Sequence, residues 1–353
     1  MRQVSFDGAS KSAELDWSRV RRVLLVRLRS IGDTVLMTPC LAAIKSWRPD
    51  IEITVLSEPL AAPLLEDHPH VDRLIVAPPG LAARARVVSR LRRMRFDVAF
   101  NMHGGTTATF FARLSGARHA AGYKGYRYSW LLTARAPSPD LLLNRPRIHS
   151  VEQQLALLHW AGVPWPASRP RLSLAVSDAA RANVRARLEE AGLSESRFAL
   201  IAPSAAFESK RWKAAGFAAV VDHLRDGYNL PSIIIAGPAQ DDIAREVSER
   251  SRAKPLVVTG MGLKELTAMI GASSIFVGND SGPAHIAAAL ARPLTVVFGS
   301  SDSSVWHPWT ESEYRLIESS DISIKQVSEA EVIAAVDEVM RAAVAVKDGI
   351  SVK

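Results

Sequence analysis

From residue 21 onward, short apolar runs alternate with longer segments of mixed polarity. Such short runs are typical of strands buried in a parallel sheet, and the segments between them are typical of amphipathic helices. The first half predicts strands over residues 22–28, 51–56 and 96–101 and helices over residues 34–47, 84–95 and 149–162. Pro164, Pro166 and Pro170 then break the pattern and predict a linker.

The same alternation resumes after the linker. Strands are predicted over residues 198–202, 232–236, 256–259, 274–277 and 294–298, and helices over residues 213–225, 240–252, 263–270, 283–291 and 328–346. We therefore expect an α/β protein with two doubly wound domains and a ligand in the cleft beyond the carboxyl ends of the strands. The expected parts are a flexible leader at residues 1–17, domains at residues 18–170 and 171–325, and a C-terminal helical segment at residues 326–353.

Composition indicates the class of protein and its compartment. Of the 353 residues 48% are hydrophobic and 23% charged, as in ordinary globular proteins. No apolar run reaches the roughly 18 residues of a membrane span, and residues 1–20 lack the apolar core of a secretory signal. Cys40 is the one cysteine, so no disulfide framework forms and a reducing cytoplasmic compartment is expected.

The net charge of +8 is unevenly distributed. Residues 1–170 hold 24 Lys and Arg against 13 Asp and Glu, whereas residues 171–353 hold 20 against 23. The first half therefore attracts anions, and nucleic acid, anionic lipid or a phosphorylated glycan would fit. The alternative is an Arg bias that serves solubility alone.

The most informative segment runs from Val277 to Leu290. A strand ends at Gly278-Asn279-Asp280, Ser281 can cap the following helix, and Pro283 suits its first turn. A diphosphate could bind Ser281, Gly282 and the backbone of Ala284 and His285, because N–H groups and the helix dipole favour an anion there. Asp280 could accept hydrogen bonds from sugar hydroxyls. The alternative is a plain strand–helix turn.

Two further turns follow predicted strands. After the first strand, Gly32 and Asp33 open a helix, and a carboxylate there could be a general base toward an acceptor hydroxyl or could simply cap the helix. Arg27 and Arg29 lie beside it and could bind anions or face solvent. In the second half, Ser204 and Lys210 follow residues 198–202 and could meet phosphate oxygens, although a solvated Lys/Arg run is the alternative.

Several motifs are absent from the sequence. There is no G-x-G-x-x-G dinucleotide fingerprint and no G-x-x-x-x-G-K-[ST] phosphate loop. No Asp-x-Asp pair and no His/Cys cluster indicates a metal site, so neither a metal nor a cofactor is expected. A diphosphate site of this kind must neutralise charge with Lys, Arg and helix N-termini.

In this order, the segments resemble the ADP-heptose:lipopolysaccharide heptosyltransferases, glycosyltransferase family nine. The resemblance rests on Ile31-Gly32-Asp33, on Lys210-Arg211-Trp212, and on the segment from Gly278 to Leu290 followed by Phe298-Gly299. Two weaker similarities are the segments 97–104, with His103 and Gly104, and 149–152.

The resemblance implies a GT-B architecture, with two Rossmann-like domains facing across a cleft, and an inverting transfer without metal. Asp33 would be the catalytic base and Lys210 would hold the diphosphate. Asp280 and His285 would lie at the donor, while Arg27, Arg29, His103 and Gly104 would lie on the acceptor side. The C-terminal helix could cross back to the first domain.

The expected partners are a nucleotide-sugar donor, most simply an ADP-sugar, and an anionic glycolipid such as a lipopolysaccharide core. The basic run from Arg84 to Arg95 could also rest on the inner-membrane surface or be an exposed helix without a partner. Other hypotheses are a sugar-nucleotide epimerase of the same fold and a non-catalytic sugar-nucleotide-binding protein. Nucleic acid is not expected, since no recognition module is present.

Overall fold

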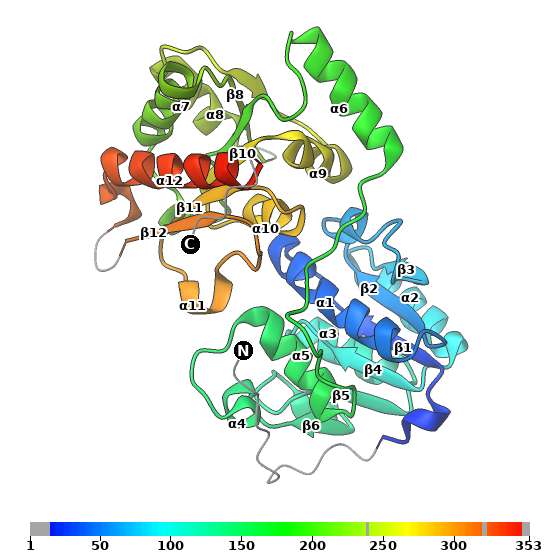
Figure 1. Cartoon of the computed structure of the whole chain (residues 1–353). Helices are drawn as coiled ribbons and strands as arrows, with labels where there is room; N and C mark the ends of the chain where they lie inside the picture. The colour runs from blue at the N-terminus through cyan, green and yellow to red at the C-terminus, as the bar shows by residue number, and fades with distance from the viewer. Residues whose placement is uncertain (1–14, 238–239, 320–322, 348–353) are drawn as a thin grey trace. The chain divides into compact units, whose positions relative to one another are not determined.

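The computed structural model describes residues 15–237, 240–319 and 323–347 (Figure 1). The chain divides into two compact units, Met1–Ala175 and Val176–Lys353. Each unit is built on one six-stranded sheet in which all the paired strands are parallel. The expected class, α/β with two Rossmann-like domains, is therefore confirmed.

The first unit alternates strands and helices along the chain. Its elements are η1 Trp17–Arg19, β1 Arg22–Val26, α1 Ile31–Trp47, β2 Glu52–Ser57, η2 Ala62–Leu64, β3 Arg73–Val76, α2 Leu81–Met94, β4 Val98–Asn101, α3 Thr106–Leu114, β5 His119–Tyr123, η3 Ser129–Leu131, β6 Ala134–Ala136, α4 Pro139–Leu143 and α5 Ser150–Trp160. The strand order is β3-β2-β1-β4-β5-β6. This is the dinucleotide-fold order, in which the direction of winding reverses between β1 and β4.

The second unit repeats this plan. Its elements are α6 Asp178–Glu190, β7 Ala199–Ala202, η4 Glu208–Lys210, α7 Ala214–Tyr228, β8 Ser232–Ile235, α8 Asp241–Arg250, β9 Leu256–Val258, α9 Leu263–Ala272, β10 Ile275–Asn279, α10 Gly282–Ala289, β11 Leu294–Phe298, α11 Ser303–Trp306, β12 Tyr314–Glu318, η5 Ile324–Gln326 and α12 Glu329–Lys347. The order β12-β11-β10-β7-β8-β9 is the same winding, with its reversal between β7 and β10.

Apolar side chains on both faces explain why the central strands read as continuous apolar runs. All four residues of β7 and all five of β10 and of β11 are buried. Val332, Val336 and Val339, spaced along one face of α12, are fully buried in the same core. Figure 1 shows α12 lying along β11 and β12, so this helix packs on the sheet of the second unit. Its predicted crossing to the first unit stays a prediction.

The pattern predicted the edge strand β9 but missed four strands at or next to the other sheet edges, β3, β5, β6 and β12. Only one of the four β3 residues is buried, none of the five in β12 is, and the short β5 and β6 are rich in alanine. Strands near a sheet edge need no long apolar run, because neighbours cover only part of them. Helices α3 and α6 were also missed, and α1 and α2 each begin three residues before the predicted start.

Candidate functional site

Two clusters of charged side chains lie at equivalent places in the two sheets. In the first unit, Arg27 follows β1 and His103 follows β4, and β1 and β4 are adjacent parallel strands. In the second, Lys210 lies in the segment after β7 and Asp280 follows β10, again on adjacent strands. Both clusters therefore lie where the strand order reverses, which is the usual ligand position in an open α/β sheet.

A buried arginine holds Asp33 in the first unit. The Arg27 guanidinium lies 2.6 Å from Asp33 Oδ1 and also donates to the Met102 carbonyl. The Arg27 side chain is 6% exposed and that of Asp33 is 23% exposed. Burial lowers the pKa of Arg27 to about 10, so it remains a cation at neutral pH. The carboxylate is thus the member of the pair that solvent can reach.

The start of α1 sets the position of Asp33. Ser30, with a positive φ of 73°, is the N-cap, and its hydroxyl accepts from the Asp33 N–H at 3.5 Å. The alternative that Asp33 itself caps the helix is therefore wrong. Asp33 lies in the first turn, where the helix dipole favours a negative charge.

A tight turn after β4 places His103 and Gly104 in the same cluster. Asn101 Oδ1 accepts from the N–H groups of both residues, at 3.1 and 2.9 Å. Gly104 has a φ of +82°, and an added Cβ would lie 2.9 Å from the Tyr126 ring, so only glycine fits. Burial, with Arg27 and Arg29 nearby, lowers the pKa of His103 to about 4 and keeps it neutral at pH 7.

Arg29 differs from Arg27. Its side chain is 62% exposed, and its Nε lies 3.6 Å from Glu58 Oε2. An exposed pair of this kind contributes little to stability. Of the two arginines expected on the acceptor side, Arg29 can therefore contact a solvent-borne anion directly, whereas Arg27 is committed to Asp33 and Met102.

A lysine–carboxylate pair forms the second cluster. Lys210 Nζ lies 2.7 Å from Asp280 Oδ2, and the Ser301 hydroxyl donates to the same oxygen at 2.5 Å. The Asp280 side chain is 4% exposed and that of Lys210 is 27% exposed. Here the carboxylate is buried and the ammonium group is the member that solvent can reach.

The Trp of the Lys-x-Trp segment anchors this cluster. Trp212 is buried, donates through Nε1 to Val327 O at 3.0 Å, and donates its N–H to Asn279 Oδ1 at 3.0 Å. Asn279 Nδ2 in turn donates to Pro203 O at 2.8 Å, which ties β10 to the end of β7. An added Cβ on Gly299 would lie 2.2 Å from Ser209 O, so only glycine fits at this position directly after β11.

His285 completes the second cluster from α10. Its Nε2 lies 4.0 Å from Asp280 Oδ1, and its Nδ1 is buried without a hydrogen-bond partner among the residues described. Burial, together with the charge of Lys210 and with His307, lowers the pKa of His285 to about 4, although Asp280 opposes this. The ring is therefore neutral at pH 7.

The first turn of α10 offers an anion fewer free backbone N–H groups than the sequence implied. Ser281 is the N-cap by position, but its hydroxyl donates to Asn279 O at 3.1 Å. The Ala284 N–H donates to Ser281 O at 3.1 Å, and Pro283 has no N–H. Gly282 is the first residue of the helix. Ser204 lies at the end of β7, where its hydroxyl accepts from the Gly237 N–H at 3.4 Å.

The sequence did not indicate Ser301, Asn279 or Tyr126 as site residues. Ser301 and Asn279 each lie at the end of a predicted buried strand, and that position was the available signal. Burial raises the pKa of Tyr126 to about 12, so it stays protonated beside Arg27. No signal in the sequence pointed to Tyr126.

Within the described part of the chain, no group of three or more His, Cys, Asp or Glu side chains could hold a metal ion. Over the same residues, no helix is both long enough and apolar enough to cross a bilayer.

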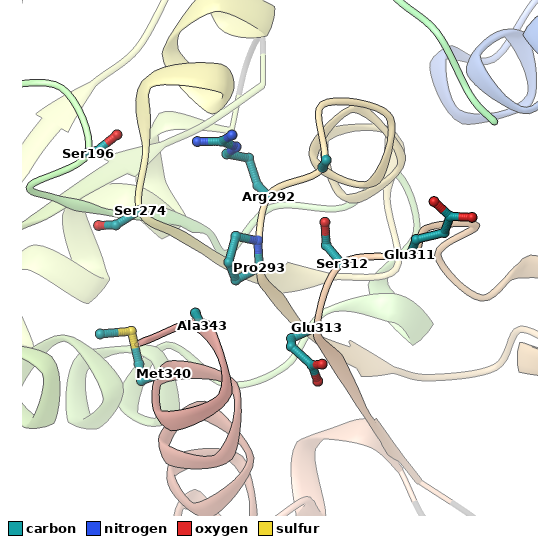
Figure 2. A pocket seen from close by; sticks show the side chains of 10 residues that line it. Ser196, Ser274, Arg292, Pro293, Glu311, Ser312, Glu313, Met340 and Ala343 are labelled. Atoms are coloured by element: carbon teal, nitrogen blue, oxygen red, sulfur yellow. The ribbon is translucent and has the colours of Figure 1, made fainter. Parts of the chain in front are cut away.

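A pocket of about 390 Å³ lies at the opposite end of the second sheet (Figure 2). Ser274 precedes β10, Pro293 precedes β11 and Glu313 precedes β12, so the pocket lies at the amino ends of the strands. Figure 2 shows the Arg292 and Glu313 side chains pointing away from one another. Since ligands of such sheets bind at the carboxyl ends, this pocket is separate from the charged cluster.

Comparison with known families decides the assignment. The model of glycosyltransferase family 9 (heptosyltransferase) matches residues 84–332. The chain belongs to this family. It is therefore a glycosyltransferase, as the resemblance of its three segments implied.

Individual members of glycosyltransferase family 9 match over most of their length. Lipopolysaccharide heptosyltransferase 3 of Escherichia coli is 27% identical over 89% of this chain and 97% of its own. A family 9 glycosyltransferase structure from Veillonella parvula has a TM-score of 0.83 and 21% identity, covering 94% of this chain and 99% of that one. E. coli heptosyltransferase WaaC with ADP has a TM-score of 0.74 and 18% identity, covering 90% and 99%. These structural likenesses confirm the GT-B fold.

Proposed function

We propose that this family 9 enzyme transfers heptose from ADP-heptose to an anionic glycolipid, with inversion at the anomeric carbon and without a metal. The donor is inferred from the relatives, which include E. coli structures with ADP and with ADP-2-deoxy-2-fluoro heptose. The acceptor class is inferred from lipopolysaccharide heptosyltransferase 3 of E. coli and from the basic first half of the chain. The enzyme would act at the cytoplasmic face of the inner membrane.

One observation carries the proposal. The two ion pairs occupy equivalent strand-order reversals, but the solvent-accessible member is an anion in one unit and a cation in the other. A carboxylate that solvent can reach can accept a proton from a hydroxyl. An ammonium group that solvent can reach can neutralise a diphosphate. A glycosyl transfer with a diphosphate leaving group needs one of each.

The reaction would be a single displacement. Asp33, oriented by Arg27, takes the proton of the acceptor hydroxyl as that oxygen attacks the anomeric carbon. The bond between this carbon and the diphosphate oxygen breaks, and the electron pair leaves with the nucleotide. Lys210 stabilises the growing charge, with Ser281, Gly282 and the start of α10 adjacent to it. Attack from the face opposite the leaving group inverts the anomeric centre.

The remaining site residues divide between donor and acceptor. Asp280 and His285 lie with Lys210 in the second unit, and we assign them with Ser204 to the donor. His103 and Gly104 lie at the Arg27 cluster, and we assign them with Arg29 to the acceptor. Neutral His285 can donate or accept a hydrogen bond to the donor without adding charge.

A thermal-shift screen of nucleotides tests the donor assignment. ADP at 100 times its Kd should stabilise the protein by about 2.7 kcal/mol, while UDP and GDP at the same concentration should not. Product analysis with ADP-heptose and a lipopolysaccharide core then tests transfer. Turnover of the sugar nucleotide without an acceptor would favour the epimerase hypothesis, and binding without turnover would favour a non-catalytic protein.

A further inference from the structure

The buried carboxylate of Asp280 has two donors on the same oxygen. Lys210 Nζ lies 2.7 Å from Oδ2, and the Ser301 hydroxyl donates to that oxygen at 2.5 Å. The other oxygen, Oδ1, lies 4.0 Å from His285 Nε2, which is too far for a hydrogen bond. Because Asp280 is buried, water cannot readily replace a donor that is lost. Lys210 and Ser301 therefore share the stabilisation of one buried charge.

The side chain of Lys210 is free to turn away from this pair. It is partly exposed, and its ammonium group lies at the end of a flexible four-carbon stem. The backbone of its segment is held on both sides. The Ser300 hydroxyl donates to Ser209 Oγ at 2.9 Å, and Lys325 Nζ lies 2.7 Å from Glu208 Oε1. Lys210 can therefore reach toward an incoming anion by side-chain rotation, without a shift of the segment.

Ser301, by contrast, is held in place by the turn after β11. On one side of it, the lack of a Cβ on Gly299 lets the turn pack directly on Ser209 O. On its other side Asp302 is the N-cap of α11, and its side chain accepts from the Ser304 N–H at 3.0 Å. The serine side chain is also short. Its hydroxyl therefore stays at the Asp280 carboxylate when Lys210 turns away.

We propose that Ser301 is a positioning residue that holds Asp280 while Lys210 turns to the diphosphate of the donor. An ammonium group that neutralises a carboxylate is less available to a second anion. Binding of a diphosphate by Lys210 therefore requires another donor for the Asp280 charge, and Ser301 is the one that stays. The proposal deepens the proposed function, on which it rests for diphosphate binding by Lys210. Ser301 itself does not contact the donor and acts through Asp280 and Lys210.

Calorimetric binding of ADP to the full chain tests this role. Ser301→Ala should weaken ADP binding by about 10-fold. A hydrogen bond to a charged group corresponds to roughly 10- to 100-fold in an equilibrium constant, and part of that is already lost in the free chain, where Lys210 still neutralises Asp280. Ser301→Thr keeps the hydroxyl and should bind ADP as the parent does. Ser301→Cys, with a weak S–H donor, should lie between the two.

Ser304→Ala is the matched control for this series. Its hydroxyl also donates to a carboxylate, that of Asp302, but Asp302 is exposed and water can replace the donor. This variant should bind ADP with the affinity of the parent.

A double-mutant cycle with Asp280→Asn separates this role from a purely structural one. Without the buried charge, Lys210 leaves no unpaired carboxylate behind when it turns. In the Asp280→Asn background, Ser301→Ala should therefore change ADP affinity by less than about twofold.

Three outcomes would overturn the proposal. They are ADP binding by Ser301→Ala equal to that of the parent, a 10-fold loss that persists in the Asp280→Asn background, and failure of Ser301→Thr to restore affinity. In each of these the parent still binds ADP, so the transferase proposal stands. No ADP binding by the parent itself would instead overturn the donor assignment, and this proposal with it.

Discussion

The two units share a strand order but place opposite charges toward solvent. At the β1–β4 reversal the arginine is buried and Asp33 is partly exposed, whereas at the β7–β10 reversal Asp280 is buried and Lys210 is partly exposed. In the proposed mechanism, one scaffold would thus serve proton removal in one unit and anion neutralisation in the other. The difference shows that the fold supplies the position of a site, while the depth of each ion-pair partner decides its chemistry.

The largest effect is expected from Asp33→Asn. The amide oxygen can still accept from Arg27 but cannot take a proton, so kcat should fall about 10²–10⁴-fold while ADP affinity is unchanged. Steady-state transfer and calorimetric ADP binding measure the two quantities. Asp50→Asn, an exposed carboxylate paired with Arg48, is the control and should keep full activity. Near-normal turnover of Asp33→Asn would show that Asp33 is not the base and that the two ion pairs do not divide the chemistry in the way proposed.

Loss of the cation should destabilise the protein more in the second ion pair than in the first. Lys210→Met leaves the buried Asp280 without its cation and should cost about 3 kcal/mol or more in the free energy of unfolding. Arg27→Met leaves Asp33 within reach of water and should cost less, about 1–2 kcal/mol for its lost hydrogen bonds. Urea unfolding of the two variants measures the difference.

A double variant sharpens this contrast. Lys210→Met with Asp280→Asn removes the unpaired charge, so stability should return most of the way to the parent value while transfer stays impaired. Equal costs for Lys210→Met and Arg27→Met would show that the two pairs do not differ in the way that their burial indicates.

Stability should also depend on pH. The pKa of His285 is about 4 in the folded chain and about 6.5 when unfolded, so the unfolded chain binds the proton first as pH falls. Stability is therefore lost from about pH 6.5 down to about pH 4, by up to about 3 kcal/mol at 1.36 kcal/mol per pKa unit. His285→Gln and His103→Gln should each flatten this slope by a similar amount, because the pKa of each histidine is lowered to about 4 in the folded chain. Urea unfolding at pH 5 and pH 7 tests it, and an unchanged slope in His285→Gln would contradict it.

The central part of the fold could be predicted from the sequence. Strands buried on both faces need uninterrupted apolar runs, and β1, β2, β4, β7, β8, β10 and β11 all lie within or close to the predicted ranges. Outer strands such as β3 and β12 lack that requirement and were missed. Gly104 could be identified in the sequence, but the Tyr126 ring that makes glycine necessary at this position comes from another loop.

By itself, the sequence determined two alternating α/β halves and the three segments that carry the family resemblance. It also determined that Asp33, Lys210 and Asp280 each follow a predicted strand. Only the tertiary structure decided that Lys210 pairs with Asp280, seventy positions away, and that Arg27 pairs with Asp33 and does not face solvent. Parallel strands must be joined by crossovers, so neighbours in the sheet are distant in the chain. The packing around those crossovers sets how deeply each charged side chain is buried, and its chemistry depends on that burial.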